Sequence, residues 1–245
     1  MKKDEIAILM AAGLGTRMLP LTRTTPKPLV KVHGIPMIET VIRALERRGI
    51  KRIYVVTGWL KEQFYYLQEK YENLEIIENA EYEVKNNISS LYAVGDLLGS
   101  ADCFICEADL YVSDKDIFNK CTGKSCYYGK MVPGYSEDWV FELEDDRIVR
   151  VGKGGKDTYN MVGISYWEKK DARIIREGIL QAYKEEGHGE LFWDEIADRK
   201  LKEMDVTVLG IPSGSIVEID TLEELRNVDS SYSDSVCGRA GDAEE

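Results

Sequence analysis

The 245 residues of the chain, 44% hydrophobic and 31% charged, suffice for one sizeable α/β core, alone or with a small appended lobe. A formal net charge of -12 argues against a nucleic-acid partner, since such proteins usually present a basic face. No stretch approaches the ~20 apolar residues of a membrane span, and the five cysteines show no metal-binding spacing, so we expect reduced thiols, no membrane association and a cytoplasmic location.

The first half of the chain alternates between expected strands and helices. Apolar runs predict strands at residues 5–11, 52–57, 74–78 and 102–107, and helical spacing predicts helices at 37–48, 61–71 and 89–98. This alternation is typical of a doubly wound α/β fold with a mostly parallel, Rossmann-like sheet. Ligands in such folds bind beyond the carboxyl ends of the strands, which directs attention to the loops after the first and fourth strands.

The second half has a different pattern, with expected strands at 125–132, 139–143, 147–151, 163–167, 206–211 and 215–218 and helices at 170–185 and 192–203. We expect these elements to extend the sheet as a mixed sheet and to build a small lid over a second substrate. Residues 1–228 are therefore interpreted as one domain, with a nucleotide-binding half (1–124) and an acceptor-binding half (125–228). Residues 229–245 are polar and acidic without periodicity, which predicts a disordered tail or a linker.

A glycine-containing loop, AAGLGTR at residues 11–17, follows the first strand directly. Gly13 and Gly15 would let the backbone approach a polyphosphate closely, and Arg17 and Lys27 would supply positive charge. The spacing matches neither a P-loop nor a dinucleotide-binding fingerprint. By itself, a G-x-G after a strand is as often a simple tight turn.

Two acidic pairs stand at the ends of expected strands. Glu107 and Asp109 follow the fourth strand, and Glu218 and Asp220 follow the last one. Alternation places the members of each pair on one side, so both pairs could converge on one Mg²⁺, which prefers carboxylate, phosphate and water ligands. The alternative is that Asp109 and Asp220 begin turns or cap helices.

The segment AAGLGTRMLPLTRTTPKPLVKVHGIPMIE resembles the signature of the nucleotidyltransferase superfamily that makes nucleotide-sugars and CDP-alcohols. The resemblance implies that Gly13 and Gly15 hold a triphosphate and that Arg17 and Lys27 are catalytic cations. It also implies that Asp109 is catalytic and holds Mg²⁺ together with Asp220. Glu218 ranks next as a metal ligand, and Glu107 ranks last. The nucleotide is then expected to contact Ala11, Ala12, Gly13, Gly15, Thr16, Arg17, Lys27, Asn87 and Ser90.

Further segments, among them NNISSLYAV, SEDWVFELEDD, GISYW, LFWDEI and SIVEID, resemble bacterial choline-phosphate cytidylyltransferases of the LicC type. The resemblance implies transfer of CMP from CTP to phosphocholine. Phe192 departs from it, because that family tends to carry a tyrosine there. Acceptors with a primary ammonium, 2-aminoethylphosphonate or phosphoethanolamine, stay open, as does a sugar 1-phosphate. A non-catalytic sensor on the same fold is a further alternative, and the sequence does not reveal the oligomeric state.

The acceptor half is rich in tryptophan and acid. Quaternary ammonium groups bind aromatic faces with ~0.5–2 kcal/mol per ring, helped by a nearby carboxylate. We therefore expect Trp139, Trp193 and Asp194 to form a cage, with Trp167 or its neighbour Tyr166 also facing inward. Lys156, favoured over Lys153, is expected to bind the acceptor phosphate. The alternative is that these tryptophans belong to the core.

Overall fold

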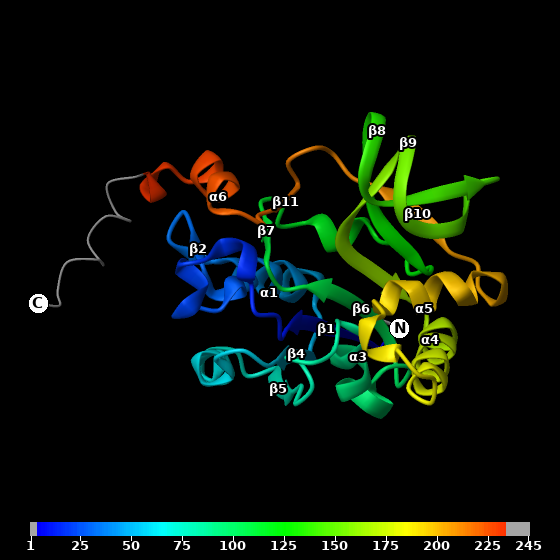
Figure 1. Ribbon diagram of the computed structural model, residues 1–245, viewed down its shortest axis with the longest axis horizontal. Helices are drawn as coiled ribbons and strands as arrows, with labels where there is room; N and C mark the ends of the chain where they lie inside the picture. Colours follow the sequence, from blue (N-terminus) through cyan, green and yellow to red (C-terminus); the bar gives the residue numbers. More distant parts are fainter. Residues whose placement is uncertain (1–3, 234–245) are drawn as a thin grey trace, which may run out of the picture.

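A seven-stranded sheet organises the computed structural model, which describes residues 4–233 (Figure 1). The strand order is β5-β4-β1-β6-β9-β8-β10. Four neighbouring strands are parallel, β5 (Leu74–Glu78), β4 (Ile53–Thr57), β1 (Glu5–Ala11) and β6 (Asp102–Glu107). β9 (Arg147–Trp167) is antiparallel to both β6 and β8 (Cys126–Glu144), and β10 (Thr207–Gly210) runs parallel to β8. This mixed sheet confirms the predicted fold class.

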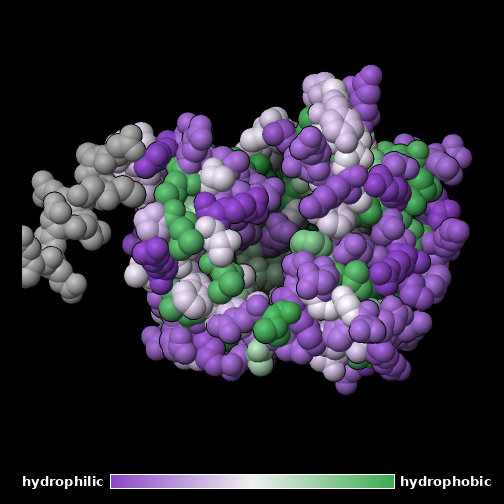
Figure 2. Space-filling view, in the orientation of Figure 1, coloured by the Kyte–Doolittle hydropathy of each residue, from purple (hydrophilic) through white to green (hydrophobic). Residues whose placement is uncertain are grey.

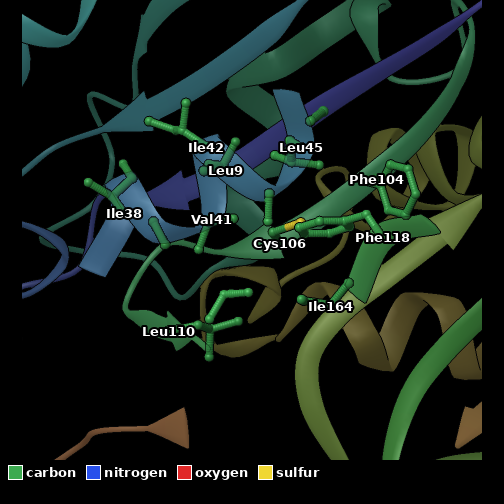
Figure 3. Packing of buried hydrophobic residues seen from close by; sticks show 14 of the residues in the cluster. Leu9, Ile38, Val41, Ile42, Leu45, Phe104, Cys106, Leu110, Phe118 and Ile164 are labelled. Carbon is green, nitrogen blue, oxygen red and sulfur yellow. The ribbon is translucent and has the colours of Figure 1, made fainter. Parts of the chain in front are cut away.

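Helices cover both faces of the sheet, and the alternation along β1 shows why. Ala7 and Leu9 pack into the core on one face, together with α1 (Met37–Arg48), whereas Ile6 and Ile8 pack on the other. That second core contains side chains of α3 (Ile88–Val94), α4 (Lys169–Ala182) and α5 (Trp193–Lys200). Figure 3 shows Leu9 among side chains of α1 and β6. A strand buried on both faces has a continuous apolar sequence, which made β1 recognisable.

Shorter elements complete the fold. They are β2 (Lys31–Val32), β3 (Ile35–Pro36), α2 (Tyr66–Lys70), β7 (Leu110–Val112), β11 (Ile216–Glu218), α6 (Leu222–Val228) and the 3₁₀ turns Thr16–Met18, Leu21–Arg23, Lys27–Leu29, Lys61–Phe64, Gly95–Leu97, Ile117–Lys120, His188–Glu190, Leu201–Glu203 and Ser230–Tyr232. The expected helix at 61–71 is thus a 3₁₀ turn followed by α2. No helix within residues 4–233 has the length and apolarity to cross a membrane.

The pairing of β7 with β11 determines where the two acidic strand ends lie. These strands are antiparallel, with Leu110 opposite Glu218, so Asp109 and Asp220 are brought to the same place. Asp220 is not the cap of α6: Thr221 is the N-cap, and its side chain accepts a hydrogen bond from the Glu224 backbone N–H. The capping alternative for Asp220 is therefore wrong.

The hairpin of β8 and β9 differs from expectation. Four short strands were predicted between residues 125 and 167, but two long strands of 19 and 21 residues pair through several register shifts. Residues 152–156 of β9 are rich in glycine, and they pair with residues 135–140 of β8. Neither segment shows the alternation of apolar and polar residues that identifies a strand. Bulges of this kind redirect side chains, so the sequence pattern could not show which ones face the cleft.

The first residues of the predicted tail contact the rest of the protein. The Asp229 carboxylate accepts a hydrogen bond from the His33 backbone N–H at 2.6 Å, and the Tyr232 hydroxyl donates to the Lys31 carbonyl at 2.9 Å. Residues 229–233 are therefore attached to the β2–β3 turn, through contacts that depend on tertiary structure. Residues 234–245 of the predicted tail lie outside the described residues.

Candidate active site

Two adjoining clefts open at the carboxyl ends of β1 and β6, where the fold predicted a site. The first, about 390 Å³, is lined by the loop of residues 10–17 and by residues after β5. The second, about 800 Å³, is lined mainly by β8, β9 and β11. Arg17, Asn87, Glu107 and Asp220 line both. Figure 2 shows the molecule hollowed near the centre of the visible face. Two substrates bound in these clefts would meet at the shared residues.

Gly15 gives the loop its shape. Its φ of 64° lies in the left-handed region, and an added Cβ would stand 3.0 Å from both Lys27 Cβ and Thr22 Cγ2. The Thr22 hydroxyl donates to the Gly15 carbonyl at 2.8 Å and holds the turn. Gly13 is different, since nothing lies within 4 Å of its added Cβ and it borders the first cleft. The loop therefore packs on Lys27 at Gly15 and is open to a ligand at Gly13.

Lys27 joins the two predicted metal carboxylates. Its Nζ lies 2.6 Å from Asp109 Oδ2 and 2.5 Å from Asp220 Oδ1, while Arg17 contacts Asp220 at 2.9 Å. Burial lowers the pKa of Lys27, but the charges and hydrogen bonds of both aspartates outweigh it, so its pKa stands above the ordinary value. The sequence prediction that Arg17, Lys27, Asp109 and Asp220 converge matches this geometry.

Negative charge accumulates around this cluster. Desolvation, followed by the charges of Asp220 and Asp109, raises the pKa of Glu218 to about 7. Desolvation, followed by Asp109 and Glu218, also holds the pKa of Glu107 well above its usual range. Within residues 4–233 no three His, Cys, Asp or Glu side chains form a ready-made metal site. Two converging carboxylates fit a Mg²⁺ ion that takes its other ligands from phosphate and water.

The far end of the first cleft is built by residues after β5 and at the start of α3. The buried Asn79 amide donates to Ser89 Oγ at 2.9 Å and to Ser90 Oγ at 3.3 Å, which holds Ser90 in the cleft wall. Asn87 accepts a hydrogen bond from the Trp193 backbone N–H and so ties α3 to α5. Asn79, Tyr82 and Lys85 were missed as lining residues, although the position of Asn79 just after a parallel strand was a usable signal.

The second cleft contains one of the predicted tryptophans. Trp139 lines it and meets the Phe192 ring edge-on, with centroids 5.5 Å apart. Asp194 also lines it from the start of α5 and accepts a hydrogen bond from the Tyr127 hydroxyl at 3.1 Å. Desolvation of this buried carboxyl raises the pKa of Asp194 to about 7. The predicted positions of Trp139 and Asp194 are compatible with an acceptor site.

The other two tryptophans belong to the core. Trp167 is 0% exposed, donates from Nε1 to Ser165 Oγ at 2.9 Å and lines neither cleft. Trp193 packs on Tyr127 and on Trp167, and it borders only a void of about 10 Å³ beside the second cleft. The prediction that Trp167 contacts the acceptor is wrong, and Trp193 does not form the wall of the second cleft. Both rings point into the core between the sheet and the helices of that face.

The lysine that was predicted to bind the acceptor phosphate also lies outside the second cleft. Lys156 is exposed on the hairpin opposite Tyr135 and does not line the second cleft. Lys153 and Lys130 line it instead. Register shifts between β8 and β9 separate these positions, so spacing from the GISYW segment was a poor guide. Lys130 was not singled out by the sequence, because a lone lysine in a strand carries no signal.

A doubly wound sheet, a glycine loop and a lysine-bridged aspartate pair between two clefts define the architecture of a nucleotidyltransferase. The family described as "Nucleotidyl transferase" matches residues 6–123. A 2-aminoethylphosphonate cytidylyltransferase from Lancefieldella rimae is 52% identical over 92% of this chain and 92% of its own length. A choline-phosphate cytidylyltransferase from Streptococcus pneumoniae is 35% identical over 91% of this chain and 96% of its own. This chain belongs to the nucleotidyltransferase family and is an enzyme.

One solved structure extends the similarity to three dimensions. The CTP:phosphocholine cytidylyltransferase LicC from Streptococcus pneumoniae superimposes with a TM-score of 0.85 at 34% identity, covering 93% of this chain and 99% of the other. The predicted resemblance to LicC-type enzymes is thereby confirmed. The relatives share cytidylyl transfer in their names and differ in the acceptor, so the acceptor must be argued from the second cleft.

Proposed function

We propose that this enzyme transfers CMP from CTP to 2-aminoethylphosphonate and releases pyrophosphate. The observation that carries the proposal is the composition of the second cleft, in which carboxylates outnumber aromatic rings. Seven acidic residues line it, namely Glu107, Glu137, Asp138, Asp194, Glu218, Asp220 and Glu224, against the two rings of Trp139 and Phe192. The relative from Lancefieldella rimae supports the same acceptor.

The cleft composition bears on the kind of ammonium group bound. A primary ammonium donates hydrogen bonds, which carboxylates accept strongly, whereas a quaternary ammonium has no N–H and depends on aromatic faces. The sequence favoured phosphocholine through its resemblance to LicC-type enzymes, and Trp139, Trp193 and Asp194 were expected to form a cage with Trp167 or Tyr166 facing inward. With Trp167 and Trp193 in the core, Trp139 and Phe192 offer too few faces to enclose a trimethylammonium group.

The acceptor's phosphonate would bind at the cationic part of the same cleft. Arg17, Lys130 and Lys153 line it, and Arg17 belongs to the junction with the first cleft. Acids and cations in one cleft suit a zwitterion with an ammonium at one end and a phosphonate at the other. The phosphonate would then lie beside the nucleotide, as transfer requires.

The nucleotide would occupy the first cleft. Its phosphates would follow the loop from Gly13 to Arg17, Thr16 included, and its cytosine would lie against Ala11 and Ala12 toward Asn87 and Ser90. Asp109 and Asp220 would hold Mg²⁺, with Glu218 adjacent. When bound, that ion neutralises charge on the phosphates and helps to orient the α-phosphoryl group.

The transfer itself needs little acid–base chemistry. The phosphonate oxygen is already anionic, so it can form the new bond to the α-phosphorus while the bond to the β-phosphate oxygen breaks. Arg17 and Lys27 would neutralise the departing pyrophosphate, so catalysis is mainly positioning and electrostatic stabilisation. Neither cleft is lined by a histidine of the described chain, which agrees with a reaction without a general base.

The test is pyrophosphate release with CTP and Mg²⁺, comparing 2-aminoethylphosphonate, phosphoethanolamine, phosphocholine and glucose 1-phosphate at equal concentrations. We expect the highest kcat/KM with 2-aminoethylphosphonate. Phosphocholine is the second candidate, because Trp139 and Phe192 meet at the cleft and LicC shares the fold. A higher kcat/KM with phosphocholine would replace the first proposal by the second.

A further inference from the structure

Asn160 carries an unpaired hydrogen-bond acceptor in the wall of the second cleft. The residue is only 9% exposed and lies on β9 opposite Lys130 of β8, and both residues line the cleft. Its Oδ1 is buried and has no hydrogen-bond partner. Buried acceptors of this kind are uncommon in folded proteins, because leaving one unpaired is costly.

The orientation of the Asn160 amide is determined by its neighbours. Nδ2 donates to Ser136 Oγ at 2.8 Å and to Asp138 Oδ2 at 3.0 Å. A carboxylate oxygen can only accept, so turning the amide over would place Oδ1 against Asp138 and create a repulsive contact. Ser136 is itself held, because its Oγ accepts a hydrogen bond from the Asp138 backbone N–H at 3.2 Å. The acceptor Oδ1 is therefore fixed in place rather than free to rotate.

The surroundings of Oδ1 indicate what it would bind. Asp138 stands beside the amide and Lys130 lies opposite Asn160 on β8, so both charges are close to the site. An amide oxygen accepts a stronger hydrogen bond from a donor that carries positive charge than from a neutral one. A primary ammonium supplies both the charge and the N–H, whereas a trimethylammonium supplies the charge alone.

We propose that Asn160 Oδ1 accepts a hydrogen bond from the ammonium group of the acceptor and thereby selects a primary over a quaternary ammonium. This inference rests on the proposed function and adds the residue that determines its specificity. Asp138 and Ser136 act through Asn160, by holding its amide. An acceptor without an N–H would leave Oδ1 buried and unpaired, which is how a site built to hydrogen-bond a ligand rejects an analogue.

The experiment uses 2-aminoethylphosphonate and its N-methyl, N,N-dimethyl and N,N,N-trimethyl derivatives with CTP and Mg²⁺. The first three retain at least one N–H when protonated, and the trimethyl compound has none. For the wild-type enzyme we expect a drop in kcat/KM of about 10-fold or more between the dimethyl and trimethyl compounds, the range of one charged hydrogen bond. Simple crowding would instead give a graded loss along the series.

The variant Asn160→Leu keeps the approximate volume and removes the acceptor oxygen. We expect its kcat/KM to fall ~10- to 100-fold for 2-aminoethylphosphonate and to stay within about 3-fold for the trimethyl compound, so the drop disappears. Turnover of the trimethyl compound and an unchanged KM for CTP show that the variant is folded. The matched variant Ser136→Ala removes one partner of Nδ2 but keeps Oδ1 and the Asp138 contact, so it should retain the drop.

Two results would overturn the inference, and they differ in what they imply. Asn160 does not accept the hydrogen bond if the wild-type and Asn160→Leu enzymes show the same drop, or if kcat/KM of the variant falls equally for all four compounds. In either case the proposed function is unaffected. If the wild-type enzyme prefers the trimethyl compound, the proposed function fails first and the inference falls with it.

Discussion

Lys27 Nζ lies 2.5 Å from Asp220 Oδ1, a contact between residues 193 positions apart in the sequence. The same Nζ lies 2.6 Å from Asp109, so one buried cation balances the two carboxylates proposed to hold Mg²⁺. In the absence of substrates this pairing limits the repulsion between the aspartates. It also places the lysine where the phosphates and the ion would be, which links the glycine loop to the metal site.

The replacement Asp109→Asn should abolish turnover while the protein stays folded. The side chain keeps its size but loses the charge that a divalent ion requires, and metal-assisted phosphoryl transfer depends on that charge. We expect kcat to fall by ~10³-fold or more, at or above the upper end of the ~10²- to 10³-fold range typical of losing one stabilising group. Pyrophosphate release measures the loss, and a thermal melt checks folding. A variant with normal activity would remove Asp109 from the metal site.

Gly15→Ala and Gly13→Ala form a matched pair that separates loop geometry from ligand access. At Gly15 the new Cβ would meet Lys27 and Thr22 at 3.0 Å on a backbone with positive φ, so we expect a loss of stability of about 1–2 kcal/mol and of activity. At Gly13 nothing lies within 4 Å, so the melting temperature should change little while KM for CTP rises. Equal destabilisation by both would contradict this distinction.

Trp139 and Trp167 should respond differently to substitution by alanine. Trp167 is fully buried, so Trp167→Ala should lower the free energy of unfolding by about 3–5 kcal/mol. Trp139 lines the second cleft, so Trp139→Ala should mainly raise KM for the acceptor and leave KM for CTP unchanged. Denaturant unfolding and steady-state kinetics on both variants give the comparison. A Trp167→Ala enzyme of normal stability and altered acceptor KM would return Trp167 to the acceptor site, as the sequence predicted.

Lysine variants test which cation binds the acceptor's anionic end. Lys153→Ala removes a cation that lines the second cleft and should raise KM for the acceptor by ~10-fold, in the range of a charged hydrogen bond. Lys156→Ala is the matched control, because that side chain is exposed and outside the cleft, and its kinetics should equal those of the wild type. The reverse result would return the role to Lys156.

Asp194 should make stability depend on pH. Its folded pKa is raised to about 7 by desolvation, above the unfolded value of ~3.9, so the native state binds more protons between these values. The free energy of unfolding should therefore fall as pH rises from about 4 to about 7 and level off above that. Asp194→Asn removes this contribution, so its melting temperature relative to the wild type should improve across the same window. A constant difference at all pH values would show that Asp194 does not titrate there.

Local sequence pattern was enough to predict much of the fold and half of the site. The apolar run of β1, the helical spacing of Met37–Arg48 and the strand at Asp102–Glu107 each reflect burial that repeats within a few residues, so the sequence records them directly. The glycine loop, Lys27 and Asp109 follow strand ends or lie close after them. Parallel strands end at one edge, so the sequence by itself determined that these groups share a site.

Tertiary structure alone decided the acceptor side. Lys153 lines the cleft and Lys156 does not, because the register shifts between β8 and β9 change which residues face it. Trp167 is fully buried in the core, whereas Trp139 is only partly buried against the same hydrophobic cluster and also lines the cleft, a difference in depth that alternation along a strand does not encode. The unpaired acceptor of Asn160 is visible only once Ser136 and Asp138 have taken up its amide N–H groups. Composition and spacing carry no record of such contacts, because they form only when the two strands pair.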